Sequence, residues 1–189
     1  PDQKYLCAVD LGVDQVKIYK FNDETGKITL VDMLRCELES APRIIKFSPD
    51  GRFAYLICEL KNYISVYTYK DGPRGPVFEL VQTISTLNEY HSKGSAACVL
   101  RFSRDWNYVL CSNAGDNSVG IFKIDRETGM LEKICILPVS GDYPKAADFF
   151  PDNRHIMALN HESNTMTIFR INYEKKYFSL WGKPLKVET

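Results

Sequence analysis

The sequence predicts an all-β fold, specifically a β-propeller whose blades are four-stranded antiparallel sheets. Two repeated motifs support this prediction. The first contains a turn followed by an apolar strand and occurs in full at residues 47–59, 102–114 and 149–161. The second is an apolar strand that begins at Val16, Ile64, Val119 and Met166. Both motifs recur with offsets of 48, 55 and 47 residues, if residues 1–11 are taken as a copy of the first motif without its leading strand. Repeats of about 40–50 residues that contain four strands are typical of propeller blades.

Each repeat reads as four strands in a fixed order. A leading strand such as RIIKF is followed by the turn SPDGR, whose Pro, Asp and Gly suit a tight reversal, and by the second strand FAYLIC. The third strand, such as ISVYTY, and the fourth, such as ITLVDML, follow after polar turns of the type DETGK. The third strands carry apolar residues at the first, third, fourth and sixth positions, which indicates a sheet covered on both faces. A solenoid of stacked repeats is the structural alternative.

The repeats divide the chain into about 3.75 blades. We expect an incomplete blade at residues 1–34 and complete blades at residues 42–87, 96–139 and 144–189. We attribute the longer middle interval to an inserted loop, KDGPRGPVFEL, and a longer connection, STLNEYHSKGSAA. The count does not close a ring easily, and the chain opens inside a repeat without Met, so we expect a fragment or a processed product.

The composition excludes several classes of protein. The 24 Lys and Arg residues balance the 24 Asp and Glu residues, which argues against a nucleic-acid-binding protein. No apolar run approaches the roughly 18 residues that a membrane span needs. The six cysteines form no C-x-x-C pair, so we expect reduced structural thiols in a cytoplasmic protein, with disulfides or a catalytic cysteine as alternatives. We expect no metal site and no cofactor, because no metal-ligand spacing and no glycine-rich phosphate loop is present.

Residues that occupy the same rim position in different blades, but differ in chemistry, are the candidates for a site. One such position follows the second strand and is occupied by Leu11, Glu59, Ala114 and His161. Another opens the leading strand and is occupied by Arg43, Cys98 and Lys145. Arg43 and Glu59 belong to adjacent strands of one blade, where a guanidinium and a carboxylate could bind an anionic substrate and activate a nucleophile. The alternative is an ordinary ion pair that ties two strands together.

The last blade offers an analogous pair, Lys145 and His161, although His161 could equally be a solvated rim histidine. Asn113, which precedes Ala114, belongs to the same rim. We expect His91, in the long connection, and His155, in a tight turn, to face the solvent rather than to take part in catalysis.

The repeats resemble the lactonase family of seven-bladed propellers. The resemblance lies in DLGVDQVKIYKF, APRIIKFSPDGRFAYLICEL, CSNAGDNSVGIFKIDRETG and FFPDNRHIMALNHESNTMTIFRI, and it covers essentially the whole chain. This family includes a bacterial 6-phosphogluconolactonase and the fungal 3-carboxymuconate lactonising enzyme. The resemblance implies the C-terminal half of a protein of about 340 residues, in which seven blades of about 48 residues close a ring.

The resemblance also implies roles for individual residues. The family's Pro-Arg-His is Pro42-Arg43-Ile44 here, and its Asn-Glu-Leu is Cys58-Glu59-Leu60, so Arg43 and Glu59 match the proposed catalytic Arg and Glu. The family's Ser-Asn-Arg-Gly is Ser112-Asn113-Ala114-Gly115, and its last Pro-Arg is Pro144-Lys145. We therefore expect Asn113, Lys145 and His161 to bind substrate. Ala114 lacks the family's cation, which puts both the standard substrate and catalysis in question. A further catalytic His of the family would lie before Pro1.

The resulting expectation is a sugar-lactone hydrolase of carbohydrate metabolism, of the pentose phosphate pathway type, that acts on an anionic sugar lactone in the propeller channel. A non-catalytic propeller that binds a ligand or a protein, and a lactonising cycloisomerase of the muconate type, are the alternatives. We expect the other partner to be the N-terminal half of the propeller or a second copy of the chain, with no nucleic acid and no membrane. On its own the chain should have little activity.

Overall fold

The computed structural model describes residues 3–73, 75–89 and 94–187, and this part of the chain is built from β-strands. It contains one 3₁₀ turn, Leu11–Val13, and no α-helix. The first sheet comprises β1 (Tyr5–Asp10), β2 (Gln15–Phe21) and β3 (Ile28–Arg35). The second comprises β4 (Pro42–Phe47), β5 (Phe53–Cys58), β6 (Tyr63–Gly72) and β7 (Gly75–Ser85). The third comprises β8 (Arg101–Phe102), β9 (Tyr108–Asn113), β10 (Ser118–Ile124) and β11 (Leu131–Pro138). The fourth comprises β12 (Pro144–Phe149), β13 (His155–Asn160), β14 (Thr165–Asn172), β15 (Tyr177–Leu180) and β16 (Leu185–Lys186).

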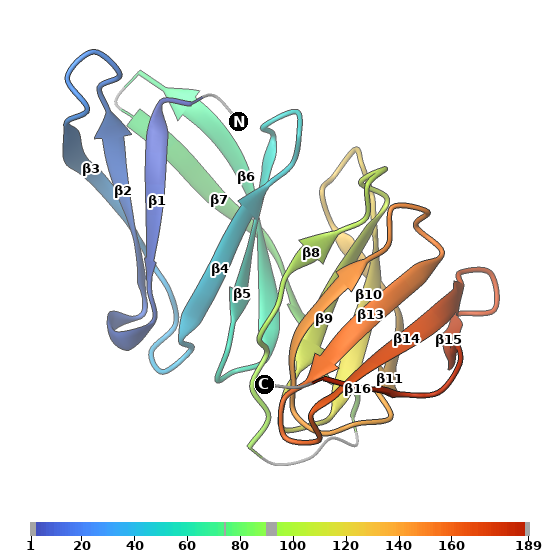
Figure 1. Ribbon diagram of the computed structural model, residues 1–189. Helices are drawn as coiled ribbons and strands as arrows, with labels where there is room; N and C mark the ends of the chain where they lie inside the picture. Colours follow the sequence, from blue (N-terminus) through green and yellow to red (C-terminus); the bar gives the residue numbers. More distant parts are fainter. Residues whose placement is uncertain (1–2, 74, 90–93, 188–189) are drawn as a thin grey trace.

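The four sheets follow one another like the blades of a partial propeller, as Figure 1 shows. Within each sheet consecutive strands are antiparallel neighbours, with the leading strand at one edge. The last sheet departs from this order because β15 and β16 both pair with β14. The predicted all-β fold with antiparallel propeller blades is therefore confirmed, and the solenoid alternative is excluded by this topology.

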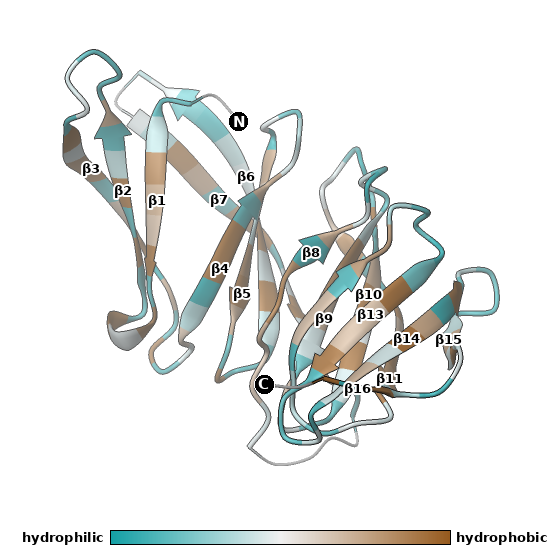
Figure 2. Cartoon of the chain, viewed as in Figure 1, coloured by the Kyte–Doolittle hydropathy of each residue, from teal (hydrophilic) through white to brown (hydrophobic). Residues whose placement is uncertain are grey.

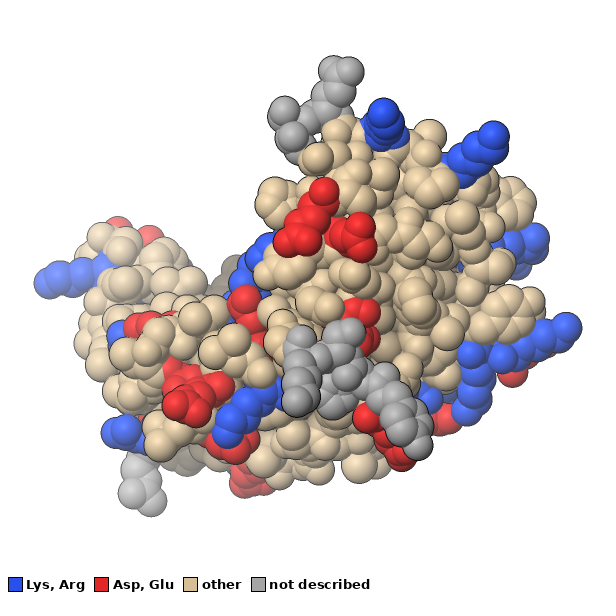
Figure 3. Space-filling model, turned by 90° about the horizontal axis from the view of Figure 1, so that it is seen from below, with Lys and Arg blue, Asp and Glu red and all other residues tan. Residues whose placement is uncertain are grey.

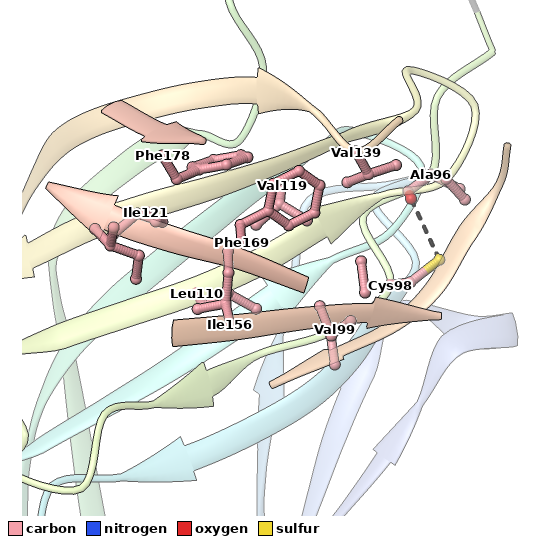
Figure 4. Close-up of a cluster of buried hydrophobic side chains, with 14 residues drawn as sticks. Ala96, Cys98, Val99, Leu110, Val119, Ile121, Val139, Ile156, Phe169 and Phe178 are labelled. Carbon is pink, nitrogen blue, oxygen red and sulfur yellow. Dashed lines mark hydrogen bonds between the residues drawn. The ribbon is translucent and has the colours of Figure 1, made fainter. Parts of the chain in front are cut away.

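The apolar core lies between neighbouring sheets. Figure 4 shows the cluster between the third and fourth sheets, where Leu110 and Val119 face Ile156 and Phe169. All six residues of β5 are buried, whereas β3 on the first sheet is mostly exposed. Figure 2 shows that apolar residues lie mostly on the strands and polar residues mostly in the turns. The inner sheets thus bury both faces, which explains why their third strands do not alternate strictly.

The segment predicted as an inserted loop forms strand instead. β6 and β7 continue as a long hairpin until Gly72 pairs with Gly75. The reason is packing, because the ring of Phe78 lies 5.1 Å from that of Tyr69 and 6.2 Å from that of Phe47. Aromatic contacts of this kind stabilise a paired strand more than an open loop. The prediction of a loop followed the Pro and Gly residues of this segment and not its apolar face.

The third blade has a shorter leading strand than its neighbours. Only Arg101–Phe102 is strand, and an isolated bridge joins Ala97 to Asn113. The Cys98 N–H still donates to the Ser112 carbonyl over 2.8 Å. The beginning of this blade therefore keeps the path of the other leading strands with fewer ladder hydrogen bonds.

A repeated Asp or Asn links each blade to the connection that follows it. This residue lies in the turn after the second strand and adopts a left-handed conformation, with φ between 49° and 53°, at Asp14, Asn62, Asn117 and Asn164. Its carbonyl accepts the N–H of the residue after the outer strand, which is Cys36, Thr86, Val139 and Val187 in turn. The offsets are again 48, 55 and 47 residues, so the repeat marks this residue as well, although the two strand motifs alone do not reveal its role.

The side chain of this residue reaches the start of the next blade in three cases. The Asp14 carboxylate accepts the N–H groups of Glu39 (2.7 Å) and Ala41 (2.8 Å), which lowers the pKa of Asp14. The Asn62 amide donates to the Ser95 carbonyl (2.9 Å), and the Asn117 amide oxygen accepts the Tyr143 N–H (2.8 Å). These bonds fix the position of each leading strand and hence of the rim residues on it.

The six cysteines are free thiols, which agrees with the sequence expectation over the disulfide alternative. No helix in the described part of the chain is long and apolar enough to cross a membrane.

Candidate functional site

Arg43 and Glu59 form an ion pair at one rim of the second blade. The Arg43 guanidinium donates through Nη1 to Oε2 of Glu59. The Glu59 side chain is 14% exposed and that of Arg43 is 35% exposed, so the carboxylate is the more enclosed partner. The backbone holds Glu59 in place, because its N–H donates to the Ala41 carbonyl (2.8 Å) and its carbonyl accepts the Ala97 N–H (3.0 Å). This rim lies at the end of the sheets where β4 begins (Figure 1), and Figure 3 views the molecule from that end.

Arg43 occupies a β-bulge. Pro42 pairs with Cys58 and Ile44 pairs with Ile57, so Arg43 is an extra residue without a partner on β5. The same irregularity recurs in the fourth sheet at Lys145, between Pro144 and Ala146. Bulges often occur beside active sites, because they redirect a side chain out of the regular alternation.

The backbone before each bulge is strained in the same way. Ala41 precedes Pro42 with φ 53°, and Tyr143 precedes Pro144 with φ 59°. Left-handed φ values at residues other than Gly, Asn or Asp are costly and persist only where the surrounding structure imposes them. Here the imposing contacts are those of Asp14 and Asn117 described above, which hold both N–H groups.

The thiol of Cys98, in the third blade, is affected by charged rim residues of the second and fourth blades. Burial raises the pKa of the Cys98 thiol, the charges of Arg43 and Lys145 oppose this rise, and the charge of Glu59 adds to it. All three charged groups therefore act on one thiol, which is consistent with their equivalent positions at the same rim of their blades. Cys98 itself is 2% exposed and its thiol donates to the Ala96 carbonyl over 3.3 Å, as the dashed line in Figure 4 shows. A buried thiol with a raised pKa is a poor nucleophile, which argues against the catalytic-cysteine alternative.

Lys145 and His161 line a common hollow on the last sheet. This hollow has a volume of about 420 Å³ and is also lined by Leu159, Asn164 and Val187. The Lys145 ammonium lies 4.8 Å from the centre of the Tyr143 ring, a cation–π distance that holds the side chain at the rim. His161 is exposed, and its N–H donates to the Tyr143 carbonyl over 3.0 Å. Both residues are exposed in this chain, and their predicted substrate-binding role stays a prediction.

Asn113 and Ala114 point into the protein. The Asn113 amide is fully buried and donates to the Thr86 carbonyl (2.8 Å) and to Ser118 Oγ (3.0 Å). Ala114 is also fully buried, and its N–H donates to the Ala96 carbonyl (2.8 Å). The N–H groups at the equivalent positions donate in the same way, that of Glu59 to Ala41 and that of His161 to Tyr143. The predicted equivalence of these positions is thus present, but Asn113 joins chain segments here, and its predicted contact with substrate stays a prediction.

The histidine expectations had different outcomes. His155 does not simply face the solvent, since its side chain is 24% exposed and its Nδ1 lies 2.6 Å from Asp152 Oδ2. The Trp181 ring covers it edge-on at 5.4 Å, a contact between distant parts of the last blade that the local turn sequence could not show. His91 lies outside the described residues. Within the described residues no group of three or more His, Cys, Asp or Glu side chains could hold a metal ion.

The arrangement favours polar chemistry on an anion. Arg43 presents further N–H donors beyond the one that Glu59 accepts, and Lys145 is a second cation at the equivalent bulge of the fourth sheet. A carboxylate held beside these cations can accept a proton from water, while the guanidinium stabilises an oxygen that gains negative charge.

Comparison with known proteins places this geometry in context. Residues 1–189 match the model of a family described as lactonase, 7-bladed beta-propeller. A 6-phosphogluconolactonase of Bacillus subtilis is 26% identical over 187 residues, which cover 99% of this chain and 52% of that protein. An uncharacterised protein of Lactococcus lactis is 34% identical over 169 residues, which cover 89% of this chain and 48% of that protein.

Solved structures agree with these sequence relationships. The periplasmic gluconolactonase of Pseudomonas aeruginosa superposes with a TM-score of 0.88 at 27% identity, over 99% of this chain and 52% of its own. A putative 6-phosphogluconolactonase of Bacteroides fragilis superposes with a TM-score of 0.84 at 26% identity, over 100% of this chain and 53% of its own. The chain spans about half the length of the relatives that it matches.

Proposed function

The chain belongs to the lactonase family of seven-bladed β-propellers, and from that premise we propose that the complete protein hydrolyses an anionic sugar lactone. The observation that carries the proposal is the Arg43–Glu59 ion pair, which is held at a β-bulge at the rim of the second blade. Relatives described as 6-phosphogluconolactonases support 6-phosphogluconolactone as the first substrate to test.

In the proposed reaction water attacks the lactone carbonyl carbon, and the bond from that carbon to the ring oxygen breaks. Glu59 takes a proton from the attacking water and returns it to the departing ring oxygen, which becomes a hydroxyl group. Arg43 donates hydrogen bonds to the carbonyl oxygen, which gains negative charge as water adds. The products are the open-chain acid and the regenerated carboxylate of Glu59, so no external reagent other than water is consumed.

Lys145 is proposed to bind the anionic group of the substrate. It stands on the next bulge of the same type and is accessible, whereas the buried Ala114 offers no charge. A cation that binds substrate and transition state equally should affect KM more than kcat. This assignment therefore makes a prediction different from that for Glu59.

The test is lactone hydrolysis by the complete protein, measured after subtraction of the spontaneous rate. We expect Glu59→Gln to lower kcat by about 10²–10⁴, the usual contribution of a general base. Arg43→Met should lower kcat, and Lys145→Met should mainly raise KM. The matched control is Lys61→Met, which removes another ion pair near this rim, that of Lys61 with Glu37, and should leave both constants unchanged. An unchanged kcat in Glu59→Gln would refute the proposed mechanism.

A non-catalytic binding propeller is the second candidate, and the apolar Ala114 at a rim position favours it. In that case the complete protein would bind the acid product but show no turnover above the spontaneous rate. A lactonising cycloisomerase of the muconate type would use the same pair to move a proton during ring closure. It would convert an unsaturated dicarboxylate and leave sugar lactones intact.

The outer faces of the two end sheets fit a partner blade. Leu6 and Leu30 on the first sheet and Leu159 and Trp181 on the last blade are 36–55% exposed, more apolar surface than a sheet usually shows to water. We propose that the rest of the propeller covers these faces and that a second copy does so when this chain is alone. Sedimentation of the 189-residue chain should show association, and a stable monomer would contradict it. A cytoplasmic location and a role in the pentose phosphate pathway remain predictions, because the Pseudomonas aeruginosa relative is periplasmic.

A further inference from the structure

Trp106 occupies a turn position that adopts positive φ in all four copies of the repeat, including Gln3 with φ 58° in the first, and it is the bulkiest residue there. The turn between the first and second strands contains Gly51 with φ 71° in the second blade and Asn153 with φ 55° in the fourth. Trp106 takes the same place in the third blade with φ 57°. A bulky side chain at positive φ is a conformational outlier, and such strain tends to occur where a side chain is needed for function.

The strained backbone places the indole over a groove between the second and third blades. The ring stacks on Phe102, with centroids 4.2 Å apart and an interplanar angle of 25°, and Phe102 in turn meets Tyr55 edge-on at 5.2 Å. Trp106 lines two hollows of about 400 and 430 Å³ that share Ser48 and Pro49. Volumes of this size suit a small molecule. The indole therefore forms a wall of two adjoining hollows and is only partly covered.

The polar lining of the hollow of about 400 Å³ is held in place by its own hydrogen bonds. Arg52 donates through Nε to Asp50 (2.7 Å) and through Nη2 to the Arg126 carbonyl (2.8 Å), while Arg126 donates to the Asp105 carbonyl. Asp50 also accepts from Ser48 Oγ (2.6 Å), and its pKa is lowered to about 2 by the hydrogen bonds from Ser48 and Arg52. The donors and acceptors are thus ordered before any ligand arrives, which lowers the entropic cost of binding.

The lining carries charges of both signs, the two cations Arg52 and Arg126 and the three carboxylates Asp50, Asp105 and Glu127. Arg52 and Asp50 are already paired with each other, so the lining has no excess of cations that would hold an anionic ligand. A neutral ligand that both donates and accepts hydrogen bonds satisfies both kinds of group. A flat apolar face on the same ligand can pack on the indole, which combines a large apolar surface with a rigid ring.

We propose that the groove of Trp106, Arg52, Asp50, Asp105 and Arg126 is a binding site for a neutral sugar ring. The ring's C–H face packs on the indole, and its hydroxyl groups donate to the carboxylates and accept from the guanidinium groups. The site lies at the opposite end of the blades from Arg43 and Glu59, because the turn of residues 48–52 follows the far end of β4. It is therefore separate from the proposed lactone site and independent of it.

Binding can be followed with this chain itself. The sequence holds two tryptophans, Trp106 and Trp181, so Trp181→Phe leaves Trp106 as the only tryptophan of the chain. We expect methyl glucoside and cellobiose to change its fluorescence in a saturable way, with a dissociation constant of about 1 mM, usual for ligands of this size. Gluconate, glucosamine and adenosine serve as the anionic, cationic and aromatic comparison ligands, and each should bind at least about tenfold more weakly.

Calorimetry tests the residue directly. Trp106→Gly and Trp106→Asn install the residues of the sibling turns, so the turn should keep its conformation although the stacking on Phe102 is lost, and circular dichroism checks that the fold is retained. Both should weaken cellobiose binding at least about tenfold, whereas Trp181→Phe and Glu59→Gln should leave it unchanged. Undiminished binding in Trp106→Gly, equal binding of a charged ligand or adenosine, or no saturable binding of either neutral sugar would each overturn the proposal.

Discussion

Replacing Asn62 tests how the blades are joined beside the candidate site. Its amide donates to the carbonyl oxygens of Leu60 (3.1 Å) and Ser95 (2.9 Å), and Asn62 is 8% exposed. Ser95 precedes Ala97, whose N–H donates to the Glu59 carbonyl (3.0 Å). Loss of the amide should therefore loosen the start of the third blade and the backbone of Glu59 together.

The magnitude follows from two separable contributions. Two hydrogen bonds of about 0.5–1.5 kcal/mol each stabilise the fold by about 1–3 kcal/mol. The φ of 52° costs an alanine about 1 kcal/mol more than an asparagine or a glycine. Asn62→Ala should thus lower the free energy of unfolding by about 2–4 kcal/mol. Asn62→Gly should lower it by about 1–3 kcal/mol, because the glycine tolerates the backbone conformation.

Asn164 provides the matched control. It has the equivalent φ of 49° and the equivalent main-chain bond to Val187, but within the described residues its side chain makes no comparable hydrogen bond to the start of another blade. Asn164→Ala should therefore cost only the conformational part, about 1 kcal/mol, and Asn164→Gly should change little. Urea unfolding followed by circular dichroism gives the four values, and hydrogen exchange at the Ala97 amide reports the local effect. Equal destabilisation by Asn62→Ala and Asn164→Ala, with unchanged exchange at Ala97, would refute the reasoning.

Three further predictions concern packing, thiol reactivity and acid stability. Gly129→Ala, at φ 74°, places a Cβ in overlap with the buried Phe53 ring, whereas the Cβ of Gly26→Ala, at φ 68°, meets no atom within 4 Å. Thermal unfolding should therefore show that the free energy of unfolding falls by about 2–4 kcal/mol in the first variant and by about 1 kcal/mol in the second, and equal losses would contradict this packing. Burial raises the pKa of the Cys111 thiol to about 12, so iodoacetamide at about pH 8 should not label Cys111 until the chain is unfolded. Mass spectrometry checks this, and rapid labelling of Cys111 in the folded chain would contradict its burial. The hydrogen bond from His155 lowers the pKa of Asp152 to about 2, so the contribution of the Asp152 carboxylate to stability is present above about pH 4 and is lost as the pH falls toward 2. In Asp152→Asn the free energy of unfolding should depend less on pH in this window, and an unchanged slope would count against the pairing.

Much of the fold was predictable because the repeats carry it. Equal offsets between two motifs located the strands, and the apolar third strands indicated sheets covered on both faces. The neighbours Ile121 and Phe122 show this, because they are buried in different core clusters on either side of the third sheet. The same offsets also mark Asn62 and Asn117, whose role became clear only from the N–H and carbonyl groups that they reach. A periodic sequence thus specifies the blade and its connection, since each copy solves the same packing problem.

The site was predictable only in part. Adjacent strands at one rim were enough to bring Arg43 and Glu59 together in the prediction. The bulge that projects Arg43 depends on Ala41 adopting a left-handed conformation, which no local residue preference demands. Burial of the Asn113 amide depends on where Thr86 lies after a long hairpin, a contact across 27 residues that no strand pattern encodes. Non-local contacts of this kind decide whether a rim residue faces the channel or the core.

Binding of 6-phosphogluconate, the acid that hydrolysis of 6-phosphogluconolactone would release, tests the central claim most directly. Calorimetry on the complete protein should show saturable binding of this anion, weakened at least about tenfold by Arg43→Met because a charge-assisted contact is lost. The control variant Lys61→Met should bind it as the unmodified protein does. Equal affinity in the unmodified protein and in Arg43→Met would contradict the assignment of this rim as the site for an anionic substrate.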